Sequence, residues 1–143
     1  MRRQKLILET DGASRGNPGL AGAGVVIRDD SGRRVETIGK FLGVTTNNQA
    51  EYQALITGLE AAGRHNPESI EVHSDSELLV RQMTGAYRVR NPAILPLYAR
   101  AMELTIELGN VSYRHVPREQ NSGADKLANV AIDSRGRRSV LEE

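Results

Sequence analysis

Cysteine is absent from this chain, and several other residue types are scarce. Without cysteine, the 143 residues can form no disulfide, no thiolate zinc site and no cysteine nucleophile. The three histidines, His65, His73 and His115, do not have the spacing of zinc ligands. There is no Trp and a single Phe, so we expect a mostly aliphatic core. These absences exclude disulfide-stapled, zinc-finger and thiol-enzyme classes.

Long apolar runs are missing as well. The apolar runs present are too short to cross a bilayer, and the basic N-terminus leads into a strand-like run, not into a signal sequence. We therefore expect a cytoplasmic, monomeric protein that does not enter a membrane. The length suits one domain with one core, which we place at residues 1–133, followed by a basic, flexible tail at residues 134–143.

The net charge of the chain is only +1, so its overall charge does not indicate a polyanionic partner. Its basic residues are 16 Arg and only 3 Lys. Arginine suits bidentate contacts with phosphate, although a biased genome composition is the simpler explanation of the excess. Local clusters are more informative, and they lie at residues 88–90, 114–118 and 135–138.

Hydrophobic periodicity predicts an α/β fold. We expect strands at residues 5–11, 23–28, 34–42, 69–74 and 110–116, and helices at 52–59, 78–83, 94–108 and 124–132. Tight turns join the first three strands, so these should be antiparallel, whereas strand–helix–strand units should add two parallel strands by right-handed crossovers. The prediction is a mixed five-stranded sheet flanked by helices.

Four carboxylates stand out against this order of elements: Asp11, Glu51, Asp75 and Asp125. Each lies where a strand ends or a helix begins. If the fold brings them together, their combined charge is very unfavourable unless cations fill the pocket. Hard carboxylate oxygens favour Mg²⁺ or Mn²⁺, and the natural chemistry of such a site is metal-assisted phosphoryl transfer.

Each acid also has a structural interpretation. Glu51 fits a capping box with Asn48, although Thr46 and Gln49 form an equally good box two residues earlier, which leaves Glu51 spare. Asp75 is a candidate N-cap for the helix that follows it. Taken singly, each acid is more often structural than catalytic. Taken together, the four acids indicate a site.

Two further motifs in the sequence have alternative interpretations. Ser74-x-x-Glu77 is a second possible capping box for the short helix, which would leave Asp75 in its first turn. The pair Gly22-x-Gly24 resembles part of a dinucleotide-binding motif, but Ile27 stands where the third glycine should be, and a strand follows where a helix should begin. We reject a dinucleotide site.

The chain resembles ribonuclease H type 1. The segments that carry the resemblance are Thr10-Asp11-Gly12 with Gly16-Asn17-Pro18-Gly19, Thr46-Asn47-Asn48-Gln49-Ala50-Glu51, Ser74-Asp75-Ser76, and His115 ten residues before Asp125 in Ala124-Asp125-x-Leu127-Ala128. The resemblance covers about residues 4 to 133. It implies a metal-dependent endonuclease that cleaves the RNA strand of RNA–DNA hybrids and leaves 5′-phosphate and 3′-hydroxyl ends.

The resemblance also implies roles for single residues. Asp11 would bridge two Mg²⁺ ions, Glu51 and Asp75 would hold the ion nearer the leaving 3′-oxygen, and Asp125 would help to hold the ion that activates the attacking water. His115 matches a mobile histidine that assists proton transfer or product release. A structural histidine at a strand end is an equally good interpretation of His115.

Substrate contacts follow from the same resemblance. Asn17, Asn47 and Asn48 match positions that read 2′-hydroxyl groups in the minor groove, which separates RNA from DNA. Thr46 and Asn91 match a pocket for a phosphate of the DNA strand. We also include Gln49 among the substrate-binding residues, at a position where many members carry a basic residue.

The chain departs from the better-known bacterial pattern at residues 84–91. Many members carry a Lys- and Trp-rich basic excursion there, but this segment has neither residue type. Arg88 and Arg90, or the basic residues 135–138, are candidates to replace it. The compact pattern resembles a subgroup that sometimes also accepts double-stranded RNA.

Two alternative functions stay open. One is a non-catalytic hybrid-binding module. The other is a DNA-directed nuclease of the same broad fold, and the Asn47–Asn48 pair argues against it.

Overall fold

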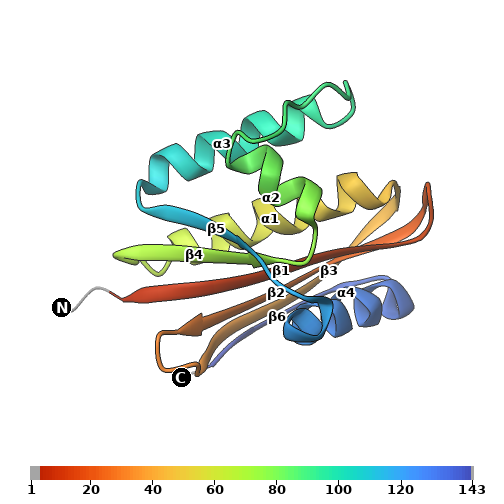
Figure 1. Cartoon of the computed structure of the whole chain (residues 1–143). Coiled ribbons are helices and arrows are strands. Elements are labelled where there is room, and N and C mark those ends of the chain that lie inside the picture. Colours follow the sequence, from red (N-terminus) through yellow and green to blue (C-terminus); the bar gives the residue numbers. More distant parts are fainter. Residues whose placement is uncertain (1–3, 143) are drawn as a thin grey trace.

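A single mixed sheet forms the centre of the protein, with helices on both of its faces (Figure 1). The structure, a computed structural model, describes residues 4–142. The elements are, in chain order, β1 (Lys5–Gly16), β2 (Gly19–Asp29), β3 (Arg34–Thr45), α1 (Asn47–Gly63), β4 (Ser69–Ser74), α2 (Glu77–Met83), α3 (Leu95–Leu108), β5 (Val111–His115), the 3₁₀ helix η1 (Arg118–Asn121), α4 (Ser122–Ser134) and β6 (Arg137–Leu141).

The order of strands in the sheet is β5-β4-β1-β2-β3-β6. As predicted, β1, β2 and β3 are antiparallel to one another, and β4 and β5 are parallel to β1. The α/β fold class and the mixed sheet are therefore confirmed. The small difference is the number of strands, which is six in the structure and five in our prediction.

The sixth strand, β6, comes from the segment that we expected to be a loose tail. It pairs antiparallel with β3 from Lys40–Arg137 to Glu36–Leu141. This edge strand is held by backbone hydrogen bonds, which do not require a hydrophobic pattern of side chains. The polar, Arg-rich segment therefore gave no sign of a strand in the sequence. Residues 1–3 and 143, which our predicted domain and tail included, lie outside the described part of the chain.

Two boundaries differ from the prediction in ways that affect the site. The strands β1 and β2 continue through the expected Gly-rich turn and pair as far as Gly16 and Gly19, so that only two residues form the turn. The short helix α2 is capped by Ser76, whose hydroxyl accepts a hydrogen bond from the Leu79 N–H at 3.2 Å. Neither Asp75 nor the Ser74 capping box begins this helix, so Asp75 is not an N-cap.

The main core lies between the sheet and the layer of α1, α2 and α3. It is aliphatic, as expected, with Leu8 and Val72 of the sheet packed under Leu55 and Leu59 of α1. Tyr52 is the large aromatic side chain in this core, and its hydroxyl donates to Gln82 Oε1 at 2.7 Å. This layer holds α1 rigidly over β1, which matters for the position of Glu51.

Helix α4 packs on the opposite face of the sheet, and two glycines of β2 allow its close approach (Figure 1). A Cβ atom at Gly24 would lie 1.8 Å from the carbonyl oxygen of Ala124, and one at Gly22 would lie 2.3 Å from that of Ala128. The glycines that resemble a dinucleotide motif therefore serve helix–sheet packing. Because Asp11 pairs with Gly24 in the sheet, the start of α4 lies over Asp11.

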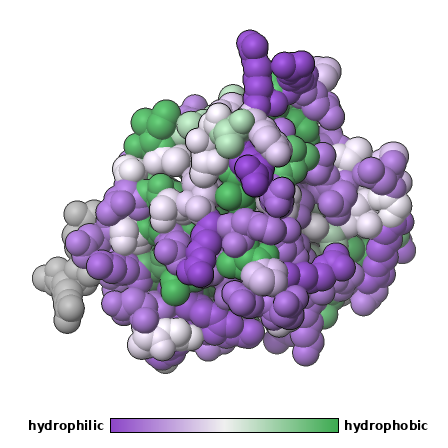
Figure 2. Space-filling view, viewed as in Figure 1, coloured by the Kyte–Doolittle hydropathy of each residue, from purple (hydrophilic) through white to green (hydrophobic). Residues whose placement is uncertain are grey.

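Hydrophobic residues on the face shown in Figure 2 form small, separated areas among hydrophilic ones. Most of the large apolar side chains are inside the protein. Within residues 4–142, no helix has both the length and the hydropathy that a membrane crossing requires.

Candidate active site

Three carboxylates from different elements converge at one place. Asp11 lies in β1, Glu51 in α1, and Asp75 directly after β4. Oxygen atoms of these three side chains all lie within 4.8 Å of one another. Asp11 and Glu51 are buried, at 5% and 6% exposure, although acidic side chains are seldom buried without a partner. The structure thus brings together three of the four acids that the sequence singles out.

The close approach of α1 to β1 depends on Gly12. A Cβ atom at Gly12 would lie 2.2 Å from the backbone carbon of Ala50. The N–H of Gly12 donates to Glu51 Oε1 at 2.6 Å and so orients this carboxylate toward Asp11. This contact gives a physical reason for glycine after Asp11.

Asp125 lies in the first turn of α4, close enough to Asp11 for its carboxyl group to contribute to the raised pKa of Asp11. One turn later, Asn129 Nδ2 donates to Asp125 Oδ1 at 3.3 Å. Arg15 in turn donates to Asn129 Oδ1 at 3.4 Å, which orients the amide. The hairpin of β1 and β2 therefore helps to position the fourth acid.

The electrostatics of the cluster favour a cation. Burial raises the pKa of Asp11 to about 9, and the nearby carboxylates of Glu51 and Asp75 add to this rise. Burial also raises the pKa of Glu51 to about 8, although the hydrogen bond from Gly12 opposes the rise. Burial and mutual repulsion therefore favour the protonated forms of these groups more than in an ordinary carboxyl group, and a bound cation would relieve both effects. Several hard oxygen donors within reach of one another fit a divalent cation such as Mg²⁺ or Mn²⁺.

A pocket of about 300 Å³ opens beside the acids. Glu51, Asp75, Asn47, His115 and Arg118 are among the residues that line it. His115 is exposed at the end of β5 and lies opposite Ser74 in β4. Arg118 Nε lies 3.9 Å from Asp75 Oδ2, which places a cationic side chain at the rim. The pocket thus combines oxygen ligands, an imidazole and a cation, which suits a phosphodiester.

Comparison with known proteins agrees with this geometry. Residues 9–131 match the family described as reverse transcriptase-like. The ribonuclease HI of Halobacterium salinarum is 46% identical over 123 residues, which are 86% of this chain and 62% of that protein. The ribonuclease H of Prosthecochloris aestuarii is 33% identical over 146 aligned positions, gaps included, and the match covers 91% of this chain and 97% of that protein. The chain belongs to the ribonuclease H type 1 family.

Solved ribonuclease H structures have the same fold. The RNase H1 of Halobacterium salinarum is 44% identical, has a TM-score of 0.88, and is matched over 91% of this chain and 98% of its own. LC11-RNase H1, solved in complex with an RNA/DNA hybrid, is 43% identical, with the same TM-score of 0.88 and the same coverage of 91% and 98%. Some relatives are longer: the chain spans 36% of a bifunctional protein of Mycobacterium tuberculosis and 62% of the Halobacterium ribonuclease HI.

The asparagines expected to face the minor groove of a hybrid lie near the acidic cluster. The side chain of Asn17 accepts a hydrogen bond from the N–H of Asn47 at 3.0 Å, which ties the β1–β2 turn to the start of α1. Asn17, Asn47 and Asn48 are all exposed. Their amide groups are thus accessible to a ligand beside the acids.

Thr46 and Gln49 have a local role as well. They form the capping box of α1, in which Gln49 N–H donates to Thr46 Oγ1 at 3.2 Å and Thr46 N–H donates to Gln49 Oε1 at 3.0 Å. Of the two alternatives for this helix start, the Thr46 box is the one that forms. Glu51 is therefore free of any capping role and points toward the other acids.

Arg88, Arg90 and Asn91 lie away from the pocket, in the segment between α2 and α3. All three are exposed, whereas Val89 between the two arginines is buried and anchors the segment. Asn91 Oδ1 accepts a hydrogen bond from the Ala93 N–H at 2.9 Å, which shapes the turn before α3.

Sequence reasoning did not identify Asn121, Asn129 or Arg15. Asn121 is fully buried, and its Nδ2 donates to the carbonyl oxygen of Thr10 at 2.8 Å, next to Asp11. Its amide oxygen has no hydrogen-bond partner within residues 4–142. The sequence offered one signal for Asn121 and Asn129: they lie four residues before and four residues after Asp125, which is the spacing of side chains on one face of a helix. This spacing is too common to identify functional residues.

Proposed function

We propose that this protein is a metal-dependent ribonuclease H that hydrolyses the RNA strand of RNA–DNA hybrids. The observation that carries the proposal is the convergence of Asp11, Glu51 and Asp75, with Asp125 near Asp11, in a member of this family. The solved complex of LC11-RNase H1 with an RNA/DNA hybrid, at 43% identity, supports the choice of substrate.

The four acids would hold two divalent cations, Mg²⁺ or alternatively Mn²⁺. When bound, such cations supply charge neutralisation at the phosphate and an activated water for in-line attack, which leaves 5′-phosphate and 3′-hydroxyl ends. The chain itself supplies the binding charge and its orientation. Gly12 aims the Glu51 carboxylate, and Asn129 and Arg15 aim that of Asp125.

His115 would move a proton at the rim of the site. Its imidazole lines the same pocket as Glu51 and Asp75, and it is accessible to solvent. An imidazole ring has one nitrogen that can accept a proton and one that can donate it, which suits this role. The exposed amides of Asn17, Asn47 and Asn48 would select the strand that carries 2′-hydroxyl groups.

The experiment that tests substrate class uses one sequence in three labelled duplexes. We expect the protein to act as a cytoplasmic monomer, so the assay uses the isolated protein at neutral pH. The RNA–DNA, RNA–RNA and DNA–DNA forms are each incubated with it in the presence of either Mg²⁺ or Mn²⁺. We expect cleavage of the RNA strand in the hybrid, weaker or no cleavage of RNA–RNA, and none of DNA–DNA. Tight hybrid binding without cleavage by either metal would instead support a non-catalytic binding module.

A further inference from the structure

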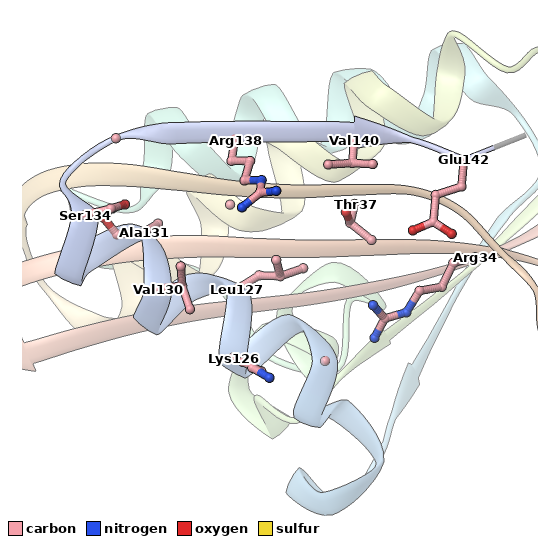
Figure 3. A pocket seen from close by; sticks show the side chains of 13 residues that line it. Arg34, Thr37, Lys126, Leu127, Val130, Ala131, Ser134, Arg138, Val140 and Glu142 are labelled. Carbon is pink, nitrogen blue, oxygen red and sulfur yellow. Dashed lines mark hydrogen bonds between the residues drawn. The ribbon is translucent and has the colours of Figure 1, made fainter.

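A second hollow lies on the α4 side of the sheet, between α4 and strand β6 (Figure 3). Its volume is about 590 Å³, within the range of ligand sites in proteins. Side chains of α4, β3 and β6 line it, and we call it the α4–β6 groove. It shares no lining residue with the pocket beside the acids, so it is a separate feature of the surface.

The middle of the α4–β6 groove is apolar. Leu127, Val130 and Ala131 present one face of α4, and Val140 of β6 lies across from them (Figure 3). Val130 is 47% exposed, so its side chain is accessible from the groove. Gly39 of β3 also lines the groove, and its lack of a side chain lets α4 pack closely there, with the Leu127 carbonyl oxygen 3.0 Å from the place of a Cβ atom. An apolar side chain of a ligand would lose water here at little cost.

The rim of the groove is cationic. Arg34, Lys126 and Arg138 line it, together with a single acid, Glu142. Within residues 4–142, none of these three cations takes part in an ion pair or a side-chain hydrogen bond. Some arginines elsewhere are paired, as Arg15 is with Asp133 at 2.6 Å, whereas others within residues 4–142, such as Arg88 and Arg114, are unpaired like those of the groove. The groove therefore has positive charge in excess and complements an anionic partner.

The cations are separated along the groove. Arg138 lies opposite Gly39 in the β3–β6 pairing, and Arg34 lies five residues earlier on β3. At the rise of a strand, their backbones are roughly 16 Å apart. An anion with one charged head would reach only one of them. An extended peptide presents every second side chain on one face, so acidic residues four positions apart, roughly 13 Å at the rise of a strand, come within reach of both long cationic side chains and place an apolar side chain between them against Val130.

We propose that the α4–β6 groove binds an extended acidic segment of a partner protein, with at least one apolar side chain between two carboxylates. The groove is open along its length between a helix and an edge strand, which suits a chain segment. Charge complementarity accounts for the unpaired cations, and the apolar centre accounts for the exposure of Val130. This site is independent of the ribonuclease activity, because it shares no residue with the acidic cluster.

The test begins with a random heptapeptide library displayed on phage and selected against the whole protein. Clones that also bind the Arg138→Glu variant are removed. We expect the remaining peptides to carry two acidic residues that flank an apolar one. Synthetic, fluorescein-labelled peptides of that sequence then give dissociation constants by fluorescence polarisation. Arg138→Glu and Val130→Asp should each weaken binding at least ~10-fold, and binding should weaken as salt is raised.

Arg137→Glu is the matched control. It makes the same charge reversal on the same strand, one residue away, where the side chain points to the other face of the sheet. It should change peptide affinity less than ~3-fold. Thermal denaturation verifies that each variant folds. If no acidic sequence is enriched, or if Arg137→Glu weakens binding as much as Arg138→Glu, the proposal is wrong. A larger loss of RNA–DNA affinity with Arg138→Glu than with Arg137→Glu would make the groove a nucleic-acid surface and also overturn it.

Discussion

Asp11 and Glu51 hold carboxyl groups where water is largely excluded, and their protonation governs how the site responds to pH. Both pKa values are raised, to about 9 and about 8. Between the ordinary carboxyl range near ~4 and these values, the folded state binds more protons than the unfolded state. The free energy of unfolding of the metal-free protein must therefore fall as pH rises through this window.

The first prediction follows from that sign. In EDTA, the melting temperature should be highest near pH 5 and should fall continuously toward pH 9. Added Mg²⁺ should raise the melting temperature more at pH 9 than at pH 5, because the cation competes with protons for the same oxygens. Calorimetry over this pH series measures both effects. A melting temperature that rises with pH in EDTA would contradict the raised pKa values.

The second prediction concerns Asp11→Asn. Cleavage of a hybrid should fall by at least ~10³-fold, because the most central of the charges that hold the cations is lost. Hybrid affinity should survive, since the exposed asparagines are unchanged. At pH 9 in EDTA the variant should melt at least ~5 °C above the wild type, and at pH 5 the two should melt alike, because a neutral amide resembles the protonated acid. Turnover near the wild-type rate would exclude the assigned role of Asp11.

The third prediction concerns His115→Ala. If the imidazole assists proton transfer or product release, steady-state turnover should fall ~10-fold or more with little change in hybrid affinity. Single-turnover rates should fall less than steady-state rates if release is the step affected. His73→Ala is a useful control, since His73 contacts Glu71 and does not line the pocket. Wild-type values for both rates in His115→Ala would leave the histidine with a structural role.

At the scale of residues, the sequence predicts the acids but not the groups that position them. Asp11 and Asp125 are recognisable because a charged residue interrupts an apolar strand or the buried edge of a helix. Asn121 has no such contrast, since an asparagine before a helix is ordinary, and only the fold reveals that its amide reaches Thr10. Roles that depend on contacts between distant parts of the chain are not visible in local patterns.

At the scale of elements, two helices bring their acids to β1 because glycines remove side chains from the contact surface. Gly12 admits α1, and Gly24 admits α4. Each contact is backbone against backbone, so neither helix can shift to accept even a methyl group without moving its carboxylate. The geometry of the site is therefore a property of helix–sheet packing as much as of the acids themselves.

The fourth prediction tests this packing. Gly24→Ala should lower the free energy of unfolding by about 2–3 kcal/mol and should reduce cleavage, because the new Cβ would displace the start of α4 and with it Asp125. Gly136→Ala is the matched control, since its Cβ would have no neighbour closer than 3.9 Å. Urea denaturation and cleavage rates compare the two variants. Equal stability of both would show that α4 adapts more freely than the contact distances imply.

The fifth prediction concerns the segment between α2 and α3. Since this segment lacks the Lys-rich excursion, the logarithm of hybrid affinity should fall only gently with the logarithm of salt concentration. Arg88→Ala with Arg90→Ala should reduce that slope further, by about one to two units, if both side chains contact phosphate. Arg137→Ala with Arg138→Ala serves as the comparison. An unchanged slope in the first pair and a reduced slope in the second would move the phosphate contacts to β6.

Regular elements with a buried side were predictable, and elements held by backbone pairing were not. Helix α1 follows from its Tyr52-Leu55-Ile56-Leu59 stripe, although it extends beyond the predicted residues 52–59 at both ends, and β4 follows from its alternation with the predicted bounds. Strand β6 lacks any such pattern, because an edge strand with arginines buries little. The long β1–β2 hairpin was also missed, since its glycines indicate a turn before the strands actually end.

At the scale of the whole molecule, the sheet order explains why acids far apart in the chain meet. The strand β1 lies at the centre of the sheet, with β4 on one side and β2 on the other. Acids from both halves of the sequence can therefore lie close to Asp11. The crossover from β3 to β4 places α1 on one face of the sheet, whereas α4, which connects β5 to the antiparallel strand β6, lies on the other (Figure 1). Chain order predicts the side of α1, because parallel crossovers are almost always right-handed.

The most direct test of the central claim is a single-turnover cleavage assay on an RNA–DNA hybrid whose RNA strand carries a 5′ label. Products are separated beside markers that end in 3′-hydroxyl or 3′-phosphate groups. We predict cleavage of the RNA strand with Mg²⁺, none with EDTA, and products that migrate with the 3′-hydroxyl markers. Products with 3′-phosphate ends, cleavage that persists in EDTA, or an intact strand with either Mg²⁺ or Mn²⁺ would contradict the assignment.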